Sequence, residues 1–203
     1  MLETIKHPTT RNGKATFNLI LRAAEMLFLE NGYHKTTVAD ITHKAGVAAG
    51  TFYLYFPSKI SLYQHLLLDI SHTIRKEIAS KIKDKTSRRD KEKEGIKAFL
   101  EYAIKNPHMY NIIWESFYID RALFREYYES FSKRYVRGLK AAQTDGEVGD
   151  IDLEIVSYVL MGITNFVGLK LILDLGDEPK SVDSVVETII QILDHGLFHS
   201  SPK

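Results

Sequence analysis

Apolar residues recur along the chain at steps of three and four, the spacing that places them on one face of an α-helix. In residues 15–31 this stripe includes Phe17, Ile20 and Phe28, and Gly32 can end the helix in a left-handed conformation. No segment shows the strict alternation typical of a half-buried strand. The pattern therefore predicts an all-α protein.

The same periodicity, read with capping residues and with glycine and proline breaks, predicts eight further helices. They cover residues 38–45, 48–55, 59–83, 95–105, 108–118, 120–142, from 150 or 152 to 175, and 182–197. Between them, the charged stretch 83–94 is polar throughout, so we expect a helix end followed by a solvated linker. Residues 176–179, Gly-Asp-Glu-Pro, predict a turn.

Composition narrows the class of protein. The chain of 203 residues is 44% hydrophobic and 26% charged, which is ordinary for a soluble globular protein. It has no cysteine, so disulfides, cysteine zinc sites and thiol nucleophiles are excluded. The first residues are polar, and the apolar stretch 156–175 is interrupted by polar side chains. We therefore expect a cytoplasmic protein that does not span a membrane.

Charge is unevenly distributed along the chain. Residues 1–93 carry 16 Lys and Arg against 9 Asp and Glu, whereas residues 94–203 carry 11 against 17. A basic N-terminal part joined to an acidic remainder is typical of a chain whose first part meets a polyanion. Uneven charge is also common in small domains, so this observation alone leaves nucleic-acid binding open.

Residues 35–59 contain two short helices separated by a tight turn. A helix-turn-helix needs such short elements because the second helix must enter the major groove, roughly 12 Å wide, while the first braces it. The predicted brace covers residues 37–45, the turn 46–48 and the reading helix 49–55. This spacing predicts a DNA-binding head.

The reading helix carries side chains suited to DNA. Gly50 and Thr51 lie near its N-terminus, where base edges are reached, and the Thr51 methyl can contact a thymine methyl. Tyr53 and Tyr55 point to different sides and offer phenolic donors to phosphates. The alternative is that both tyrosines pack against the protein.

Two further residues stand at helix N-termini, where free amides favour a phosphate. Lys59 opens the long helix, and Thr37 opens the brace helix. Val47, Phe52 and Phe56 are better explained as core.

The run from residue 32 to residue 59 reads G-Y-x-x-T-T-V-x-D-I-x-x-x-A-G-V-x-x-G-T-F-Y-x-Y-F-x-S-K, and it resembles the N-terminal domain of the TetR family of bacterial repressors. The resemblance extends over residues 16–62, about a quarter of the chain. It implies a homodimer of nine-helix subunits. Each subunit would have an N-terminal three-helix DNA-binding domain, residues 1–58, and a divergent C-terminal domain, residues 59–203, for small-molecule binding and dimerisation.

By this resemblance, the residues that correspond to DNA-contacting positions of the family are Thr37, Gly50, Thr51, Tyr53, Tyr55 and Lys59. One departure concerns Ala48-Ala49, where many members carry a polar pair before the glycine. Lys44 offers a compensating phosphate contact, and a plain surface lysine is the alternative. The predicted DNA-binding residues are Thr37, Lys44, Ala49, Gly50, Thr51, Tyr53, Tyr55 and Lys59.

Residues 95–175 are rich in large aromatic side chains, which can line an apolar cavity or fill a helical core. Asn165 is the most informative polar residue there, because a buried amide needs a partner from a ligand or a neighbouring helix. We expect a hydrophobic or aromatic effector, such as a lipid-like or acyl compound. The candidate ligand-binding residues are Tyr102, Met109, Tyr110, Trp114, Phe117, Tyr118, Phe131, Met161, Asn165 and Phe166.

These features predict a ligand-responsive regulator, most simply a repressor. Wide apolar faces on residues 152–174 and 182–197 suit a two-fold interface built as a four-helix bundle. Ligand binding would move the helix that starts at Lys59 and so change the separation of two reading heads, which must lie roughly 34–36 Å or a multiple apart.

Other classes have less support. The sequence contains no phosphate-cradling glycine loop and no G-x-S-x-G or H-E-x-x-H motif, so we expect neither an enzyme nor a cofactor. His65, Asp69 and His72 share one helix face, but exposed helices collect such residues by chance and we expect no metal. Two alternatives stay open: an all-α hydrolase or transferase with dispersed catalytic residues, which no residue pattern supports, and a helical-bundle ligand-binding or adaptor protein without sequence-specific DNA binding.

Overall fold

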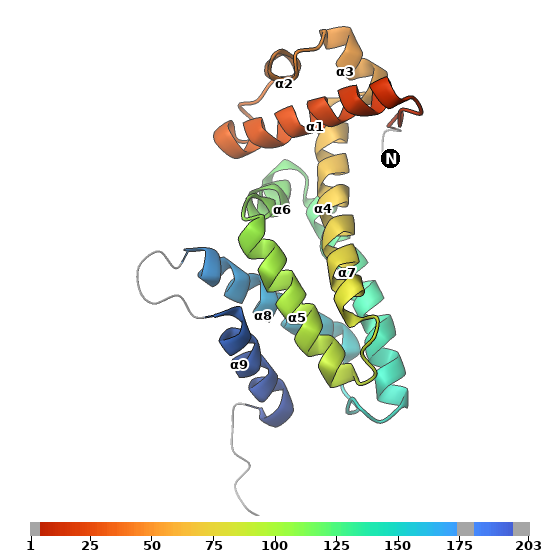
Figure 1. The fold of residues 1–203 in the computed structure, drawn as a ribbon, viewed down its shortest axis with the longest axis vertical. Helices are drawn as coiled ribbons and strands as arrows, with labels where there is room; N and C mark the ends of the chain where they lie inside the picture. The colour runs from red at the N-terminus through yellow and green to blue at the C-terminus, as the bar shows by residue number, and fades with distance from the viewer. Residues whose placement is uncertain (1–4, 174–180, 197–203) are drawn as a thin grey trace, which may run out of the picture. The chain divides into compact units, whose positions relative to one another are not determined.

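The computed structural model describes residues 5–173 and 181–196, and in these residues every regular element is a helix (Figure 1). The predicted all-α class is therefore confirmed. The turn predicted at residues 176–179 lies outside the described residues, as do the predicted helix ends at 175 and 197. The nine described helices are α1 Arg11–Asn31, α2 Val38–Ala45, α3 Ala49–Tyr55, α4 Lys59–Ile82, α5 Arg88–Lys105, α6 His108–Ile119, α7 Arg121–Thr144, α8 Leu153–Leu173 and α9 Val182–His195.

The first helix begins four residues before the predicted start at residue 15. Thr10 is its N-cap, and the Thr10 hydroxyl accepts a hydrogen bond from the amide of Gly13 at 3.1 Å. This side chain satisfies one of the amides that a helix start leaves without a partner. The basic residue Arg11 therefore lies in the first turn of α1 rather than in a preceding loop.

The prediction of a solvated linker at residues 83–94 is wrong from residue 88 onward. Helix α5 begins at Arg88, because the hydroxyl of Ser87 caps it by accepting a hydrogen bond from the amide of Asp90 at 3.1 Å. Some of the charges in this stretch are paired within the fold: Glu92 is 9% exposed and accepts hydrogen bonds from Arg88 on the same helix and from Tyr135 on α7. This charged run therefore forms a helix with a local cap and with polar partners on α5 and α7.

Contacts between helices divide the chain into two compact units. Unit 1 contains residues 1–72 and 108–128, and unit 2 contains residues 73–107 and 129–203. Helices α4 and α7 each contribute residues to both units. These units differ from the predicted division into a DNA-binding domain, residues 1–58, and a ligand-binding and dimerisation domain, residues 59–203. That functional division stays a prediction.

Unit 1 is built on an aromatic core. The rings of Phe17 on α1 and Phe56 stack with their centroids 4.8 Å apart, and Phe52 on α3 lies 5.6 Å from Phe56. Phe52, Phe56 and Ile41 on α2 expose no surface, which confirms that the two phenylalanines are core residues. Val47, in the turn, is half-buried. This core fixes α2 and α3 on α1.

Helix α6 belongs to the same unit and is tied to α4 by a buried phenol. Tyr63 on α4 is 0% exposed, and its hydroxyl donates a hydrogen bond to the carbonyl of Ile112 on α6. Burial raises the pKa of the Tyr63 phenol well above its ordinary value, so the group remains a neutral donor. A second contact joins His108, at the start of α6, to Glu25 on α1, with Nε2 and Oε1 3.0 Å apart.

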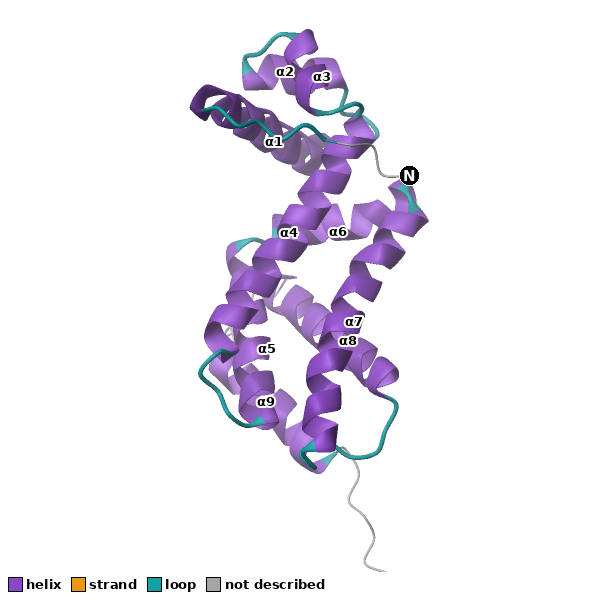
Figure 2. Cartoon of the chain, turned by 90° about the vertical axis from the view of Figure 1, so that its right-hand side faces the viewer, coloured by secondary structure: helices purple, strands orange, loops and turns teal. Residues whose placement is uncertain are grey.

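Unit 2 has α5 at its centre, in contact with α8 and α9 (Figures 1 and 2). Ile96 and Leu100 on α5 pack against Val186, Ile189 and Ile190 on α9, and all five are buried. The steps of three and four between the α9 residues repeat the spacing seen in the sequence.

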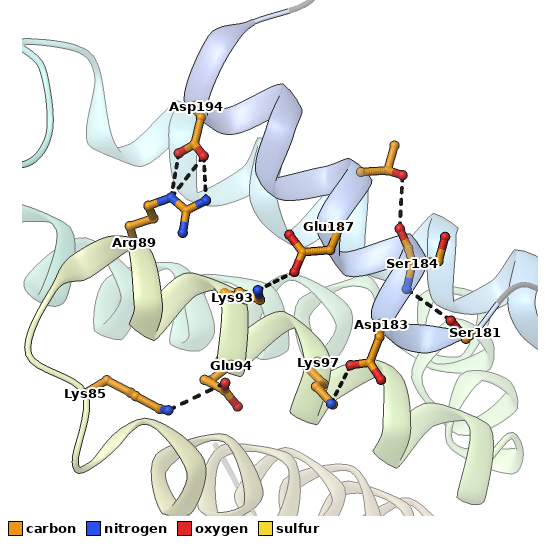
Figure 3. Close-up of polar contacts among 11 residues, drawn as sticks. Lys85, Arg89, Lys93, Glu94, Lys97, Ser181, Asp183, Ser184, Glu187 and Asp194 are labelled. Atoms are coloured by element: carbon orange, nitrogen blue, oxygen red, sulfur yellow. Dashed lines mark hydrogen bonds and ion pairs between the residues drawn. The ribbon is translucent and has the colours of Figure 1, made fainter.

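A row of ion pairs runs beside this core. Figure 3 shows Arg89, Lys93 and Lys97 on successive turns of α5, opposite acids on α9. Arg89 Nη2 lies 2.7 Å from Asp194 Oδ2, Lys97 Nζ lies 2.5 Å from Asp183 Oδ1, and Lys93 pairs with Glu187. The hydrogen bond from Arg89 lowers the pKa of Asp194. The pairing order runs backwards along α9, so the two helices are antiparallel.

We predict that Tyr63→Phe lowers the free energy of unfolding by about 0.5–1.5 kcal/mol, because it removes the buried hydrogen bond to the carbonyl of Ile112. Urea unfolding followed by circular dichroism measures the change. The matched control is Tyr118→Phe, since Tyr118 is 79% exposed and the same atom is removed at the surface. An equal loss in both variants would contradict the assigned role of the buried hydroxyl.

Candidate DNA interface

The helix-turn-helix predicted from the sequence lies in unit 1 as α2, a turn at Gly46, and α3. Gly46 has φ 67° and ψ 33°, the left-handed conformation that glycine adopts without strain, and its amide ends α2 by donating to the carbonyls of Thr42 and His43. Figure 1 shows α2 and α3 as the two short helices next to α1. The predicted bounds 37–45 and 49–55 agree with α2, with Thr37 as its cap, and with α3.

Thr37 is exposed and caps α2 through a reciprocal pair of contacts. The Thr37 hydroxyl accepts from the amide of Asp40 at 3.1 Å and donates to the Asp40 carboxylate at 2.6 Å. The same carboxylate accepts from the amide of Thr37 at 2.8 Å, and these hydrogen bonds lower the pKa of Asp40. The start of α2 therefore already holds a negative charge, and a phosphate contact by Thr37 stays a prediction.

The first turn of α3 presents small residues. Ala48, the N-cap, has no capping side chain, and Ala49 and Gly50 are both exposed. A Cβ added to Gly50 would have no atom within 4 Å, so the protein's own packing does not require a glycine there. Glycine at an open position on a protruding helix suits the close approach of another molecule.

The two tyrosines of α3 lie in different surroundings. Tyr53 is 57% exposed, and its ring meets the edge of Phe52 with the centroids 5.2 Å apart. Tyr55 is half-buried against α1, in a T-shaped contact with Phe17 at 5.6 Å. The alternative of packing therefore describes Tyr55 better than Tyr53. Leu54, which sequence reasoning did not select, is 61% exposed on the same helix.

Lys59 has an intramolecular role that the sequence did not reveal. Its Nζ donates to the carbonyls of Tyr33 and Thr36, at 2.6 Å in each case, and lies 4.0 Å from the centre of the Tyr33 ring. Burial lowers the pKa of Lys59, and the nearby charge of Glu115 opposes this shift. The ammonium group thus holds the loop between α1 and α2, and its predicted contact with a phosphate stays a prediction.

Glu115 on α6 holds the same loop from the other side. Its Oε1 accepts a hydrogen bond from the amide of Tyr33 at 2.7 Å. A Cβ at Gly32, which has φ 78°, would stand 3.1 Å from that oxygen. No local signal in the sequence points to this contact, because 82 residues separate its partners.

Lys44, the residue expected to compensate for Ala48-Ala49, is paired within the head. Its Nζ lies 3.3 Å from Glu30 Oε1 on α1, and both side chains remain partly exposed. Residues 48–58, which span α3 and its flanks, contain no charged residue. Positive charge for a DNA contact must therefore come from residues outside the reading helix.

The candidate ligand-binding residues are divided between the two units. Met109 and Tyr110 are buried, whereas Tyr118 and Phe166 are 79% and 67% exposed in the single chain. The amide of Asn165 donates to the carbonyl of Met161, on its own helix, at 2.7 Å. The effector contact of this set stays a prediction. Unit 1 holds Met109, Tyr110, Trp114, Phe117 and Tyr118, and unit 2 holds Tyr102, Phe131, Met161, Asn165 and Phe166.

His65, one of three residues considered for metal ligation, packs in the aromatic core. Its ring lies 5.3 Å from that of Phe17 and 5.4 Å from that of His7. Burial lowers the pKa of His65, with a smaller contribution from the charge of His7. Within the part of the chain that the structure describes, no three His, Cys, Asp or Glu residues are grouped to hold a metal ion.

Comparison with known sequences gives a family match at this head. The family described as bacterial regulatory proteins, tetR family, matches residues 20–66. Among curated proteins, the fatty acid metabolism regulator protein of Bacillus subtilis is 36% identical over 72 residues, 36% of this chain and 37% of that protein. The nucleoid occlusion factor SlmA of Haemophilus influenzae is 27% identical over 88 residues, 43% of this chain and 40% of SlmA. The chain thus spans less than half the length of the curated relatives it matches.

Solved structures extend the likeness beyond the head. The fatty acid degradation regulator FadR from Bacillus halodurans superposes with a TM-score of 0.78 at 21% identity, covering 97% of this chain and 100% of that one. FadR from Bacillus subtilis, solved in complex with stearoyl-CoA, gives a TM-score of 0.69 at 21% identity, covering 90% and 100%. At this identity the likeness concerns the fold. The resemblance noted in the sequence is confirmed for this segment: residues 20–66 match the TetR family of bacterial regulatory proteins, and the described residues share the all-helical fold of these solved structures.

Proposed function

We propose that the protein is a transcriptional repressor that binds operator DNA as a homodimer and releases it when a hydrophobic small molecule binds. The observation that carries the proposal is α3, a short helix with an open glycine and an exposed tyrosine, inside a segment that matches the TetR family. We assign DNA binding to residues 1–58 and effector binding with dimerisation to residues 59–203. Its place of action is then the cytoplasm, where operator DNA lies.

Base reading is assigned to the first turn of α3. Gly50 lets the backbone approach the groove, and Thr51 offers a hydroxyl to base edges and a methyl group to thymine. Exposed Tyr53 is placed to donate to a phosphate, which sets the orientation of the head without reading sequence. Ala49, which is also exposed, leaves room for this approach.

Dimerisation is assigned to α8 with α9. Ile155 and Val159, one turn apart on α8, are 59% and 52% exposed. Only 17% of the most apolar stretch of α8 is buried, and by length and composition alone this helix could also cross a membrane. We propose a second copy of the chain as its partner, because two helices from each subunit can cover such faces as a four-helix bundle.

The effector we propose is an acyl compound. Two relatives carry names that refer to fatty acid metabolism or degradation, and one solved relative holds stearoyl-CoA. The aromatic and methionine side chains of α5 to α8 offer apolar surface to such a chain. Since α4 is one continuous helix with residues in both units, it offers a covalent route from effector binding to the reading head.

The test of DNA binding compares two variants of α3 on operator duplexes. Thr51→Ala should relax preference at one base pair, with a loss of about 1–3 kcal/mol of discrimination there. Tyr53→Phe should weaken binding to all duplexes by a similar factor, because it removes a phosphate donor. Fluorescence anisotropy with single-base operator variants measures both effects. Equal effects of both variants on every duplex would refute the assigned roles, and a wild-type protein without sequence preference would refute the function.

The test of dimerisation places a charge on α8. Val159→Glu should shift the protein from dimer to monomer, because burying an unpaired carboxylate in an apolar interface is costly. Size-exclusion chromatography with light scattering gives the mass. The matched control is Leu68→Glu on α4, where the leucine is 57% exposed. A monomeric wild type, or the same mass for both variants, would contradict the assignment.

The test of the effector adds stearoyl-CoA to the operator complex. We expect release of the duplex, and by reciprocity the operator should weaken stearoyl-CoA binding by the same factor. Coenzyme A without its acyl chain serves as the control and should leave the complex intact. Release by both compounds, or by neither, would argue against an acyl effector while leaving DNA binding in place.

A further inference from the structure

We propose that residues 5–14, the N-terminal arm and the first turn of α1, form a second DNA contact that grips the phosphate backbone beside the bases read by α3. This inference rests on the proposed DNA-binding function and adds a surface to it. The arm is defined here as residues 5–14. Its partner is the sugar-phosphate backbone of duplex DNA, recognised by charge.

The arm is fixed against the end of the reading helix. The amide of Lys6 donates to the carbonyl of Tyr55, the last residue of α3, at 3.0 Å. The chain then folds closely over Gly13, where an added Cβ would stand 2.9 Å from Pro8 Cβ and 3.5 Å from the Tyr55 hydroxyl. The His7 ring lies 5.7 Å from Phe17, in the same aromatic core. Backbone and ring contacts therefore hold the arm beside α3, and its cationic side chains play no part in that attachment.

Those cationic side chains face solvent. Lys6, Arg11 and Lys14 are all exposed, and no ion pair joins any of them to an acid among the residues that the structure describes. Residues 4–24 contain no Asp or Glu. A group of cations without neighbouring acids keeps its full field for an external anion.

The reading helix α3 has no charged side chain of its own, so positive charge for a phosphate contact has to come from other residues. Residues 48–58 carry no charged side chain, Lys59 is held by two carbonyls, and Lys44 is paired with Glu30. Phosphate neutralisation supplies much of the affinity of DNA-binding proteins, and it requires Lys or Arg at the surface. The arm places three such residues at the end of α3 that lies away from its base-reading first turn.

The experiment measures how operator affinity depends on salt. Binding of the full-length wild type is compared with the triple variant Lys6→Ala/Arg11→Ala/Lys14→Ala, by fluorescence anisotropy between about 50 and 200 mM salt. Each lost phosphate contact should reduce the slope of log K against log salt by roughly 0.9, and a dimer loses every contact twice. The affinity should fall by a similar factor on operator and on scrambled duplex, because a backbone contact carries no sequence information.

Two further variants separate contact from general charge and from folding. The control Lys133→Ala/Arg137→Ala/Lys140→Ala removes the same charge from exposed positions on α7 and should keep the wild-type slope. The charge-preserving variant Lys6→Arg/Arg11→Lys/Lys14→Arg should keep it too. An unchanged slope in the alanine variant of the arm, or an equal loss in the α7 control, would overturn the inference. A wild type that binds no duplex would instead overturn the proposed function.

Discussion

The hydrogen bonds that hold the loop between α1 and α2 are the interaction on which the placement of α2 and α3 depends. Lys59, on α4, donates hydrogen bonds to two carbonyls of this loop, and Glu115, on α6, accepts a hydrogen bond from the amide of Tyr33. The ammonium group of Lys59 therefore binds backbone carbonyls of this loop, and the carboxylate of Glu115 binds a backbone amide of it. The loop leads directly into the cap of α2. Charge-assisted hydrogen bonds of this kind are about twice as strong as neutral ones. The position of α2, and through it that of α3, therefore depends on these hydrogen bonds in addition to the aromatic core.

Helices whose signals lie within a few residues of the sequence could be predicted, whereas contacts between segments distant in the sequence could not. The spacing of apolar residues and the Gly46 break located α2 and α3, because both signals act within a few residues. Glu115 and Tyr33 carry no mark of their pairing, since only the fold brings them together. The start of α5 was predicted too late although its cap, Ser87, is a local signal; only the partners of Arg89 and Lys93 are distant, since they lie on α9, 105 and 94 residues away.

The sequence could predict where the candidate helix-turn-helix lies, but not which intramolecular partners its side chains have. Gly50 and Tyr53 are exposed, because the short helix α3 packs against the rest of the head through Phe52 and leaves its other side in solvent. Lys59 and Lys44 illustrate the limit, since a lysine in a sequence gives no sign of the carbonyl or carboxylate it will meet. The aromatic set predicted for the effector has the same ambiguity between core and cavity, as buried Met109 and exposed Tyr118 demonstrate.

The ion pairs between α5 and α9 have a consequence for assembly. Three cations on α5, at positions 89, 93 and 97, have an acid on α9 at their own level. Sliding α9 by one turn would exchange these partners and would separate Val186 and Ile190 from their apolar contacts on α5. The register of α9 against α5 is therefore set by contacts within one chain. Under the proposed dimerisation, association through this helix would be the docking of two preformed surfaces rather than an exchange of segments between subunits.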